Sequence, residues 1–371
     1  MIQTLLICLL VIHASDCTFA KCDSCMLLRE CPEALNLASD TNPAVKQKLK
    51  DAVCGIKTVD GKRHPMICCS NFITVSERFG ETEIEIETHG NAKLLPEKCG
   101  GINGDRIIGG QYANLYEFPW MALISHVIGR HNGKRQTQFQ CGGTIINSRY
   151  ILTAAHCVES KVIAGVRVGE FNINTPEDCQ GEYPHYLCES HIQDIAVVKS
   201  IPHEDFKILP NVQNDIALLR LKVPIDFSFK NVAPVCLPLF NELRNISLDG
   251  KRATVAGWGI TEFNRASSVL RKVDLPIKTE NECRQYYDRN SDTRSSYTFD
   301  NKKFCAGETG KDSCRGDSGG PLMLEEEYKD NYRMIQFGVV SHGPQQCGSS
   351  TPGVYTDVRQ YMKWILDNIE S

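Results

Sequence analysis

The sequence predicts an all-β protein in which a small cysteine-rich block precedes a larger antiparallel β domain. Three observations carry this prediction. Six cysteines crowd the segment 21–70, and the chain after Arg106 contains short apolar and β-branched runs separated by turns. These runs are "TIINSRYILTAA", "DIALLRL", "ATVAGWG", "RMIQFGVVS" and "GVYTDV". Helical spacing of apolar residues occurs only at the end of the chain. It predicts a C-terminal helix on the β domain whose buried face contains Val358, Tyr361, Met362, Ile365 and Ile369.

The chain begins with an apolar run, Leu5 to Ile12, that is too short to cross a bilayer. Small residues follow it, as in a secretory signal peptide, and we expect residues 1–20 to be removed by cleavage after Ala20. This cut removes Cys8 and Cys17 from the eighteen cysteines and leaves sixteen, whereas a cut after Ala14 would leave an odd number. No later run is long and apolar enough for a membrane span, so we expect a secreted, extracellular protein without a membrane partner.

Charge and cysteine content narrow the classes of function. The formal net charge is -4 and the pI is about 6.2, which gives no general attraction to nucleic acid or to anionic membranes. Eighteen cysteines behind a signal peptide indicate a disulfide framework formed in an oxidising compartment.

The segment 21–70 contains few large apolar residues, so its fold must depend on disulfides. Zinc binding by Cys22 and Cys25 is the alternative. The adjacent pair Cys68 and Cys69, together with the secretory context, argues against a metal site. The segment 71–106 is more polar, and "ETEIEIETHGN" places acidic residues at alternate positions. We assign it as a linker that ends in an activation segment, although an edge strand of the small domain would show the same alternation.

The stretch "KDSCRGDSGGP" contains a candidate nucleophile, Ser318. A serine hydroxyl is a weak nucleophile unless a base accepts its proton and a third group orients that base. His156 follows an apolar run in "LTAAHC", and Asp215 begins the buried run "DIALLRL". Each residue alone has an ordinary structural interpretation: His156 as a core histidine, Asp215 as a capping residue and Ser318 as a turn residue. Together, the order His, Asp, Ser within extended signatures indicates a catalytic triad.

From Ile107 to Ser371 the chain resembles the chymotrypsin-fold serine proteases. The resemblance rests on "RIIGG", "TAAHC", "DIALLRL", "GWG", "GDSGGP" and "PGVY". The block 21–70 resembles the clip domain of arthropod clip-domain serine proteases, the easter-like members in particular, through "CMLLRECP" and the Cys-Cys pair. The resemblance implies two six-stranded antiparallel β-barrels with a C-terminal helix over 107–371, behind a clip domain.

The resemblance also implies roles for the candidate residues. His156 would act as general base and then as general acid, while Asp215 would hold its tautomer and stabilise the imidazolium. Ser318 would attack the substrate carbonyl. The backbone N-H groups of Gly316 and Ser318 would form the oxyanion hole, where one donor typically lowers the barrier by about 3 kcal/mol.

Specificity for Arg or Lys is implied by Asp312, six residues before Ser318, at the position where trypsin-like proteases keep a carboxylate at the base of the specificity pocket. A solvated loop acid is the alternative. Gly343 and Gly353 would leave the pocket walls open for a long side chain. Ser341 matches the residue that contacts substrate backbone, but His342 stands where a tryptophan is usual, so subsite preference does not follow from the family pattern.

The stretch "NGDRIIGG" reads as an activation site. Cleavage after Arg106 would free the ammonium group of Ile107 to pair with Asp317, because a buried carboxylate without a partner is costly. An ordinary turn residue is the alternative for Asp317. The sequence therefore predicts a zymogen.

The resemblance implies eight disulfides. Three would brace the clip block, one would keep the N-terminal chain attached after activation, and four would lie within the protease domain. The expected pairs are Cys22 with Cys68, Cys25 with Cys54, Cys31 with Cys69, Cys99 with Cys236, Cys141 with Cys157, Cys179 with Cys188, Cys283 with Cys305, and Cys314 with Cys347.

The loop "GEFNINTPEDC" resembles the calcium loop of trypsin-like proteases. Carboxylates of Glu170 and Asp178, with the carbonyls of Asn172 and Thr175, would suit a hard cation such as Ca2+. An acidic surface loop braced by a disulfide is the alternative. Asn245 in "NIS" is the one Asn-x-Ser/Thr sequon without proline, so we expect glycosylation there.

These features predict a secreted trypsin-like endopeptidase made as a zymogen. By resemblance, it would act in an extracellular arthropod cascade, in Toll signalling, melanisation or developmental patterning, within a haemolymph-like fluid. Its partners would be an upstream activating protease, a downstream protein zymogen or pro-ligand, and a serpin. A non-catalytic clip-domain cofactor is one alternative, disfavoured because Ser318 is present. A digestive trypsin is the other, disfavoured by the clip block.

Overall fold

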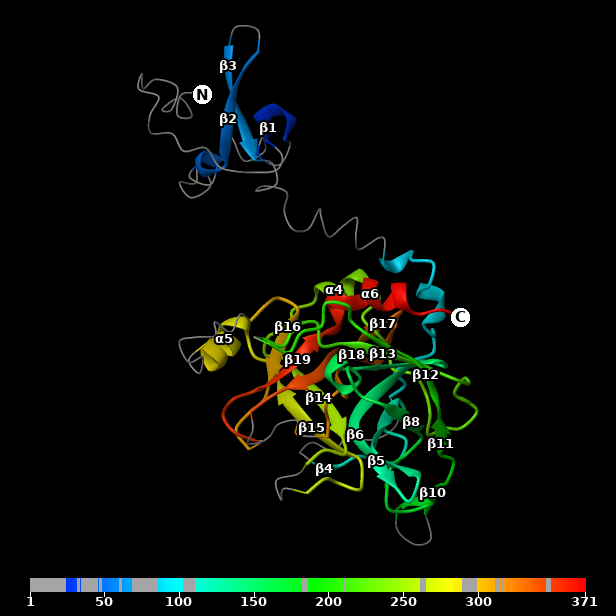
Figure 1. Cartoon of the computed structure of the whole chain (residues 1–371). Helices are drawn as coiled ribbons and strands as arrows, with labels where there is room; N and C mark the ends of the chain where they lie inside the picture. The colour runs from blue at the N-terminus through cyan, green and yellow to red at the C-terminus, as the bar shows by residue number, and fades with distance from the viewer. Residues whose placement is uncertain are drawn as a thin grey trace. The chain divides into compact units, whose positions relative to one another are not determined.

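The structure is a computed structural model of the 371-residue chain. It describes residues 25–31, 34, 46, 49–59, 62–68, 86–102, 111–181, 186–209, 211–260, 265–288, 299–310, 314, 316–344 and 348–371. The chain divides into two compact units, Met1–Glu85 and Ile86–Ser371 (Figure 1). Among the described residues, every helix is too short or too polar to cross a bilayer.

The smaller unit contains a three-stranded antiparallel sheet. Its strands are β1 (Cys25–Leu27), β2 (Val53–Val59) and β3 (Lys62–Cys68), in the order β1-β3-β2. A disulfide joins Cys25 to Cys54, as expected. Cys31 and Cys68 are also disulfide-bonded and lie in the small apolar core, but their expected partners Cys69 and Cys22 lie outside the described residues. Among the described residues of this unit, the apolar core is small, which favours a fold that depends on disulfides.

The first sheet of the larger unit closes into a barrel. Its order is β11-β8-β5-β6-β7-β13-β12, and β11 and β12, at opposite ends of this order, are separated in sequence only by Ala196. Counted as one kinked strand, they complete the expected six-stranded barrel. The strands are β5 (Met121–His131), β6 (Lys134–Asn147), β7 (Tyr150–Thr153), β8 (Ile163–Val168), β11 (Gln193–Ile195), β12 (Val197–Pro202) and β13 (Ala217–Leu221). A separate hairpin, β9 (Asp178–Gln180) with β10 (Leu187–Glu189), contains the Cys179–Cys188 disulfide.

The second sheet has the order β16-β19-β18-β17-β14-β15-β4. Ile277, just after β15, forms a bridge to Ala306 at the end of β16, so six strands close and the two-residue β4 is an addition at the edge. The strands are β4 (Gln111–Tyr112), β14 (Arg252–Gly257), β15 (Arg271–Pro276), β16 (Lys303–Ala306), β17 (Pro321–Tyr328), β18 (Asn331–His342) and β19 (Gly353–Asp357). Two buried disulfides belong to this part of the unit: Cys283–Cys305, with Cys305 on β16, and Cys99–Cys236, within the apolar core of the second barrel.

Helices are few. The helices whose bounds lie within the described residues are α4 (Asn241–Asn245), α5 (Glu280–Asp288) and the C-terminal α6 (Met362–Asn368), which continues the 3-10 turn η6 (Val358–Tyr361). The predicted C-terminal helix is confirmed, since its five spaced apolar residues are all at most 2% exposed and belong to the main core. The helical spacing therefore identified the buried face correctly.

Residues 86–102 differ from the predicted linker, because they pack on the larger unit. Ile86 and Leu95 enter its core, and Asn91 Nδ2 donates hydrogen bonds to the carbonyl oxygens of Leu366 (3.0 Å) and Ile369 (2.9 Å). The last carbonyl groups of a helix have no partner within the helix, and Asn91 satisfies two of those at the end of α6. The unit therefore begins before the expected activation site, at Ile86.

Candidate active site

His156 lies in the 3-10 turn η5 (Ala155–Cys157), which begins as the buried strand β7 ends. Cys157 is tied to Cys141 on β6 by a disulfide, and its carbonyl oxygen accepts a hydrogen bond from Nε2 of His126 at 2.7 Å. Burial lowers the pKa of His126, which fits a neutral ring that donates this bond. The turn is thus fixed on both sides, while the His156 side chain stays 26% exposed.

Asp215 precedes β13 and is 2% exposed. Its Oδ2 accepts from Nδ1 of His156 at 2.8 Å, and its Oδ1 accepts from the backbone N-H of the same residue at 2.9 Å. Burial by itself would raise the pKa of Asp215, but the interactions with His156 and Ser341 outweigh it, so the pKa lies below its usual value. The ionised carboxylate holds the proton of His156 on Nδ1 and leaves Nε2 as an acceptor.

Two contacts to Asp215 come from the second barrel. Ser341 Oγ, on β18, donates to Oδ2 at 2.5 Å, and Thr356 Oγ1, on β19, donates to the backbone carbonyl of Asp215 at 2.8 Å. Sequence reasoning did not assign a role to Thr356. The signal was available, because a threonine in the fully buried strand "GVYTD" needs a polar partner.

Ser341 Oγ also lies 3.0 Å from Nδ1 of His342. A hydroxyl has a single proton, and here it is donated to the Asp215 carboxylate, so His342 Nδ1 must be the donor toward Ser341. Burial lowers the pKa of His342 to about 4, so the ring is neutral near pH 7. The hydrogen bonds therefore run in one direction, from His342 through Ser341 to Asp215.

Ser318 lies next to His156, between the two barrels. Its carbonyl oxygen accepts from the N-H of Gly142 at 2.8 Å, and the disulfide sulfur of Cys157 lies 3.6 Å both from that oxygen and from His156 Nε2. Among the described residues, no hydrogen bond joins the Ser318 hydroxyl to His156. Such bonds are often longer before substrate is bound.

The turn that contains Ser318 requires glycine. Gly316 has a φ of 101° and Gly319 a φ of 80°, in the left-handed region that favours glycine. A Cβ atom at Gly319 would also lie 2.1 Å from Thr153 Oγ1 and 2.6 Å from the Gly142 carbonyl oxygen. The "GDSGG" stretch can therefore fold in this form only with glycine at these positions.

Asp317 directs its carboxylate away from Ser318, against the backbone of the "GWG" stretch. The carboxylate accepts hydrogen bonds from the N-H groups of Gly259 (2.8 Å) and Cys314 (2.9 Å), and a Cβ atom at Gly257 or Gly259 would collide with it. Burial of the carboxylate raises the pKa of Asp317 to about 6, although the two hydrogen bonds oppose the shift. Among the described residues, no cation contacts it, and Arg106 and Ile107 lie outside them.

The expected specificity residues are only partly described. Gly343 follows β18 and Gly353 begins β19, and a Cβ atom at Gly343 would lie 3.5 Å from Gly353 Cα, so the two face each other. Cys314 is disulfide-bonded. Asp312 and Cys347, its expected partner, lie outside the described residues.

The expected calcium loop, which follows β8 of the first barrel, brings the carboxylates of Glu170 and Asp178 close together. Glu170 is 7% and Asp178 4% exposed. Burial and the nearby Asp178 raise the pKa of Glu170, against the opposing effect of Arg167, whose guanidinium contacts Glu170 at 3.2 Å and Asp194 at 2.8 Å. The Arg167 guanidinium thus serves two carboxylates, and Asp178 lies near Glu170 without an ion pair to it, so the loop has an excess of negative charge that suits a bound cation.

The rest of that loop surrounds Asp178. Its Oδ2 accepts from the N-H groups of Phe171 and Asn172, each at 3.2 Å, and its Oδ1 lies 2.7 Å from Thr175 Oγ1. Among the described residues, the groups of three or more His, Cys, Asp or Glu side chains close enough to share a metal ion both contain the sulfur atoms of a disulfide, Cys141–Cys157 or Cys179–Cys188, which are unsuitable ligands.

Two antiparallel barrels, with a His-Asp pair on one and a glycine-framed serine beside it, define a chymotrypsin-type serine protease. Residues 107–365 match the family model described as trypsin, and residues 24–69 match the regulatory CLIP domain of proteinases. The chain belongs to the clip-domain serine proteases, and it is a serine endopeptidase.

Individual relatives span nearly the whole chain. CLIP domain-containing serine protease HP8 of Bombyx mori is 39% identical over 98% of this chain and 96% of that protein. Melanization protease 1 of Drosophila melanogaster is 36% identical, covering 94% and 91% respectively. The crystal structure of the Drosophila Grass clip serine protease of the Toll pathway superimposes with a TM-score of 0.63 at 32% identity, covering 96% of this chain and 97% of that one.

Proposed function

We propose that this chain is the secreted zymogen of a trypsin-like endopeptidase, which is activated by cleavage after Arg106 and then cleaves proteins after Arg or Lys. The observation that carries the proposal is the arrangement of His156, Asp215 and Ser318 where the two barrels meet. His156 is held by Asp215 at 2.8 Å, and one disulfide sulfur lies 3.6 Å from both His156 Nε2 and the Ser318 backbone.

In the proposed reaction, Ser318 Oγ attacks the scissile carbonyl carbon while His156 Nε2 accepts its proton. The N-H groups of Gly316 and Ser318 stabilise the oxyanion. The C-N bond then breaks as His156 returns the proton to the leaving amine, and water repeats the sequence to release the acid. Asp215 stays ionised throughout and stabilises the imidazolium.

Activation would act through Asp317. In the uncut chain its carboxylate is buried and, among the described residues, has no counter-ion. A free Ile107 ammonium would supply one and would fix the turn that contains Gly316 and Ser318. Because an α-amino group has a pKa near 8, the cut enzyme would lose activity at alkaline pH.

Asp312 would select Arg or Lys at the cut site. Ca2+ would bind at Glu170, Asn172, Thr175 and Asp178, and Asn245, which is exposed on α4, would carry a glycan. Since the relatives include a melanization protease and a Toll-pathway protease, we place the chain in an extracellular cascade of this kind. An upstream protease would activate it, a protein zymogen or pro-ligand would be its substrate, and a serpin would inhibit it.

The test is to produce the chain cut after Arg106 and to compare Arg and Phe chromogenic peptides, with Ser318→Ala and an uncut Arg106→Gln variant as controls. We expect hydrolysis of the Arg peptide only, and only by the cut chain with Ser318. Equal rates on the Phe peptide, activity that survives Ser318→Ala, or full turnover by the uncut variant would contradict the proposal.

A further inference from the structure

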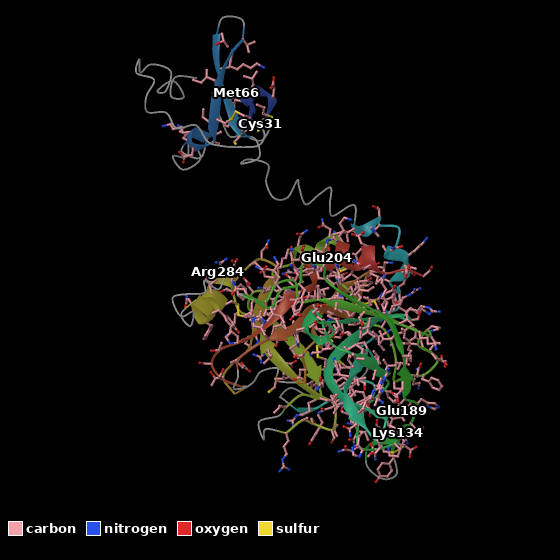
Figure 2. The ribbon with its side chains drawn as sticks, in the orientation of Figure 1. Cys31, Met66, Lys134, Glu189, Glu204 and Arg284 are labelled. Atoms are coloured by element: carbon pink, nitrogen blue, oxygen red, sulfur yellow. A yellow bond between two sulfur atoms is a disulfide. The ribbon has the colours of Figure 1, made fainter. Side chains whose placement is uncertain are left out.

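The hairpin formed by β5 and β6 projects a strongly basic tip. Its two-residue turn, Asn132-Gly133, has positive φ at both positions (49° and 76°), as a type I′ turn requires. Residues 130–138 are all exposed, and Lys134, labelled in Figure 2, lies at the margin of the larger unit. The turn type holds the tip in a defined form.

The charges on this tip have no acidic counterpart among the residues that the structure describes. Arg130, Lys134 and Arg135 lie in a stretch, 127–140, that contains no acidic residue, while the whole chain has a net charge of -4. Arg130 is directly opposite Arg135 across the hairpin, an arrangement of like charges that disfavours the folded state. Among the described residues, none forms an ion pair with these three side chains. Stability does not account for this arrangement, whereas binding to an acidic partner does.

A groove of about 280 Å³ lies at the base of the same hairpin. Ser125, Thr137 and Phe139 of β5 and β6 line one side, and Arg167 of β8 and Ile195 of β11 line the other. The Arg167 guanidinium lies 5.3 Å from the centre of the Phe139 ring. Its ion pairs with Glu170 and Asp194 hold it there, so the groove is preformed and has both apolar and polar walls.

The hairpin leads directly to the proposed reaction centre. Strand β6 continues from Arg135 to Cys141 and Gly142, and Gly142 donates the hydrogen bond to the Ser318 carbonyl. The proposed specificity residues Gly343 and Gly353 lie on the other barrel, across Ser318 from β6. A substrate that fills that pocket must therefore extend its segment after the cut along β6. The six residue-to-residue steps from Arg135 to Cys141 span about 20 Å, the length of about six residues of extended substrate.

We propose that the β5–β6 hairpin and its groove form a second binding surface for the protein substrate, which recognises an extended acidic segment beginning about six residues after the cut. The inference rests on the proposed function and adds a substrate preference to it. A sulfated polysaccharide would also bind cations. The three basic side chains lie beside a partly apolar groove and on the expected path of the substrate. This arrangement favours a polypeptide partner over a polysaccharide.

The experiment uses the full chain cut after Arg106 and three fluorogenic peptides with one Arg-containing core. One ends three residues after the cut, one adds Asp and Glu at the sixth to eighth positions after it, and one adds Asn and Gln there. The variant is R130Q/K134Q/R135Q. The matched control, K93Q/K98Q/K230Q, removes three exposed lysines of other elements.

We expect the unmodified hairpin to give about tenfold higher kcat/KM on the acidic peptide than on the neutral one, equivalent to about 1.4 kcal/mol. The gain should shrink as salt rises from about 0.05 to about 0.3 M. The hairpin variant should lose the preference for the acidic peptide, and the lysine control should keep it. The unmodified protein and both variants should cleave the short core peptide equally.

Equal rates on acidic and neutral extensions, with the core still cleaved, would overturn the inference and leave the proposed function intact. So would a hairpin variant that loses binding to heparin but keeps the preference for the acidic peptide, because the surface would then serve a polysaccharide. Failure to cleave the core would instead contradict the proposed function itself.

Discussion

At the scale of single residues, His342 stands where the family resemblance leads one to expect a tryptophan, and its hydrogen bond to Ser341 predicts a positioning role. It donates from Nδ1 to Ser341 at 3.0 Å, and Ser341 donates to Asp215. Hydrogen bonds in such a chain polarise one another. His342→Phe should therefore lower kcat/KM about fivefold, close to the effect of one neutral hydrogen bond of about 1 kcal/mol. Rates on a short Arg peptide would measure it.

The matched variants at this position are Asn, whose amide N-H lies near the position of Nδ1, and Gln, whose amide lies near Nε2. We expect His342→Asn to recover most of the activity and His342→Gln to recover little. The Phe variant should also shift the acidic side of the pH profile of kcat/KM to higher pH. Without His342, the hydrogen bond from Ser341 to Asp215 would be weaker, so the Asp215 carboxylate would keep more negative charge and would stabilise the imidazolium more strongly. If His342→Asn and His342→Gln have the same activity, and the pH profile of the Phe variant does not shift, His342 has only a packing role.

Asp317 should make the uncut chain sensitive to pH. Its folded-state pKa of about 6 lies above the ordinary value of 3.8, so the folded chain keeps a proton that the unfolded chain releases. The free energy of unfolding should therefore fall as pH rises from about 4 to about 6, by up to about 3 kcal/mol, and Asp317→Asn should remove this fall. Urea unfolding of both uncut proteins at pH 4, 5, 6 and 7 measures the difference. Parallel pH dependences would show that the carboxylate is not desolvated.

At the scale of elements, the loop between β8 and β9 (residues 169–177) should depend on calcium. With Ca2+ at about 100 times its dissociation constant, a single site contributes about 2.7 kcal/mol, so EDTA should lower Tm by about 5–10 °C. Asp178→Asn should abolish the difference. The control Glu177→Gln removes an exposed acid from the same loop and should retain it. A Tm that is unchanged by EDTA, or an equal loss in both variants, would rule out this ligand set.

The elements also show what the sequence could predict. The motifs around His156, Asp215 and Ser318 are local, and the apolar face of α6 follows from spacing, so both were accessible from sequence. The His342 hydrogen bond and the opposition of Arg130 and Arg135 depend on strand register and on contacts between barrels, which composition does not encode. Residues 86–102 read as linker because their few anchors, such as Asn91, find partners almost 280 residues away.

At the scale of the whole molecule, the proposed cleavage after Arg106 would produce two chains, and the Cys99–Cys236 disulfide would join them. Non-covalent contacts also hold the N-terminal chain. Asn91 binds two carbonyls at the end of α6, the N-H of Gly100 donates to Pro234, and the Gly100 carbonyl accepts from Met334. Ile86 and Leu95 add apolar burial. These contacts predict that the N-terminal chain stays attached even without the disulfide.

We therefore expect the cut variant C99S/C236S to keep its N-terminal chain during gel filtration at micromolar concentration. Adding Asn91→Ala removes two hydrogen bonds, each worth about 1 kcal/mol, and should weaken the association about tenfold or more. The control Lys93→Ala changes an exposed side chain of the same segment and should have little effect. If the N-terminal chain separates from C99S/C236S while Asn91 is intact, the disulfide alone joins the two chains, and reduction would release the clip domain from the active protease.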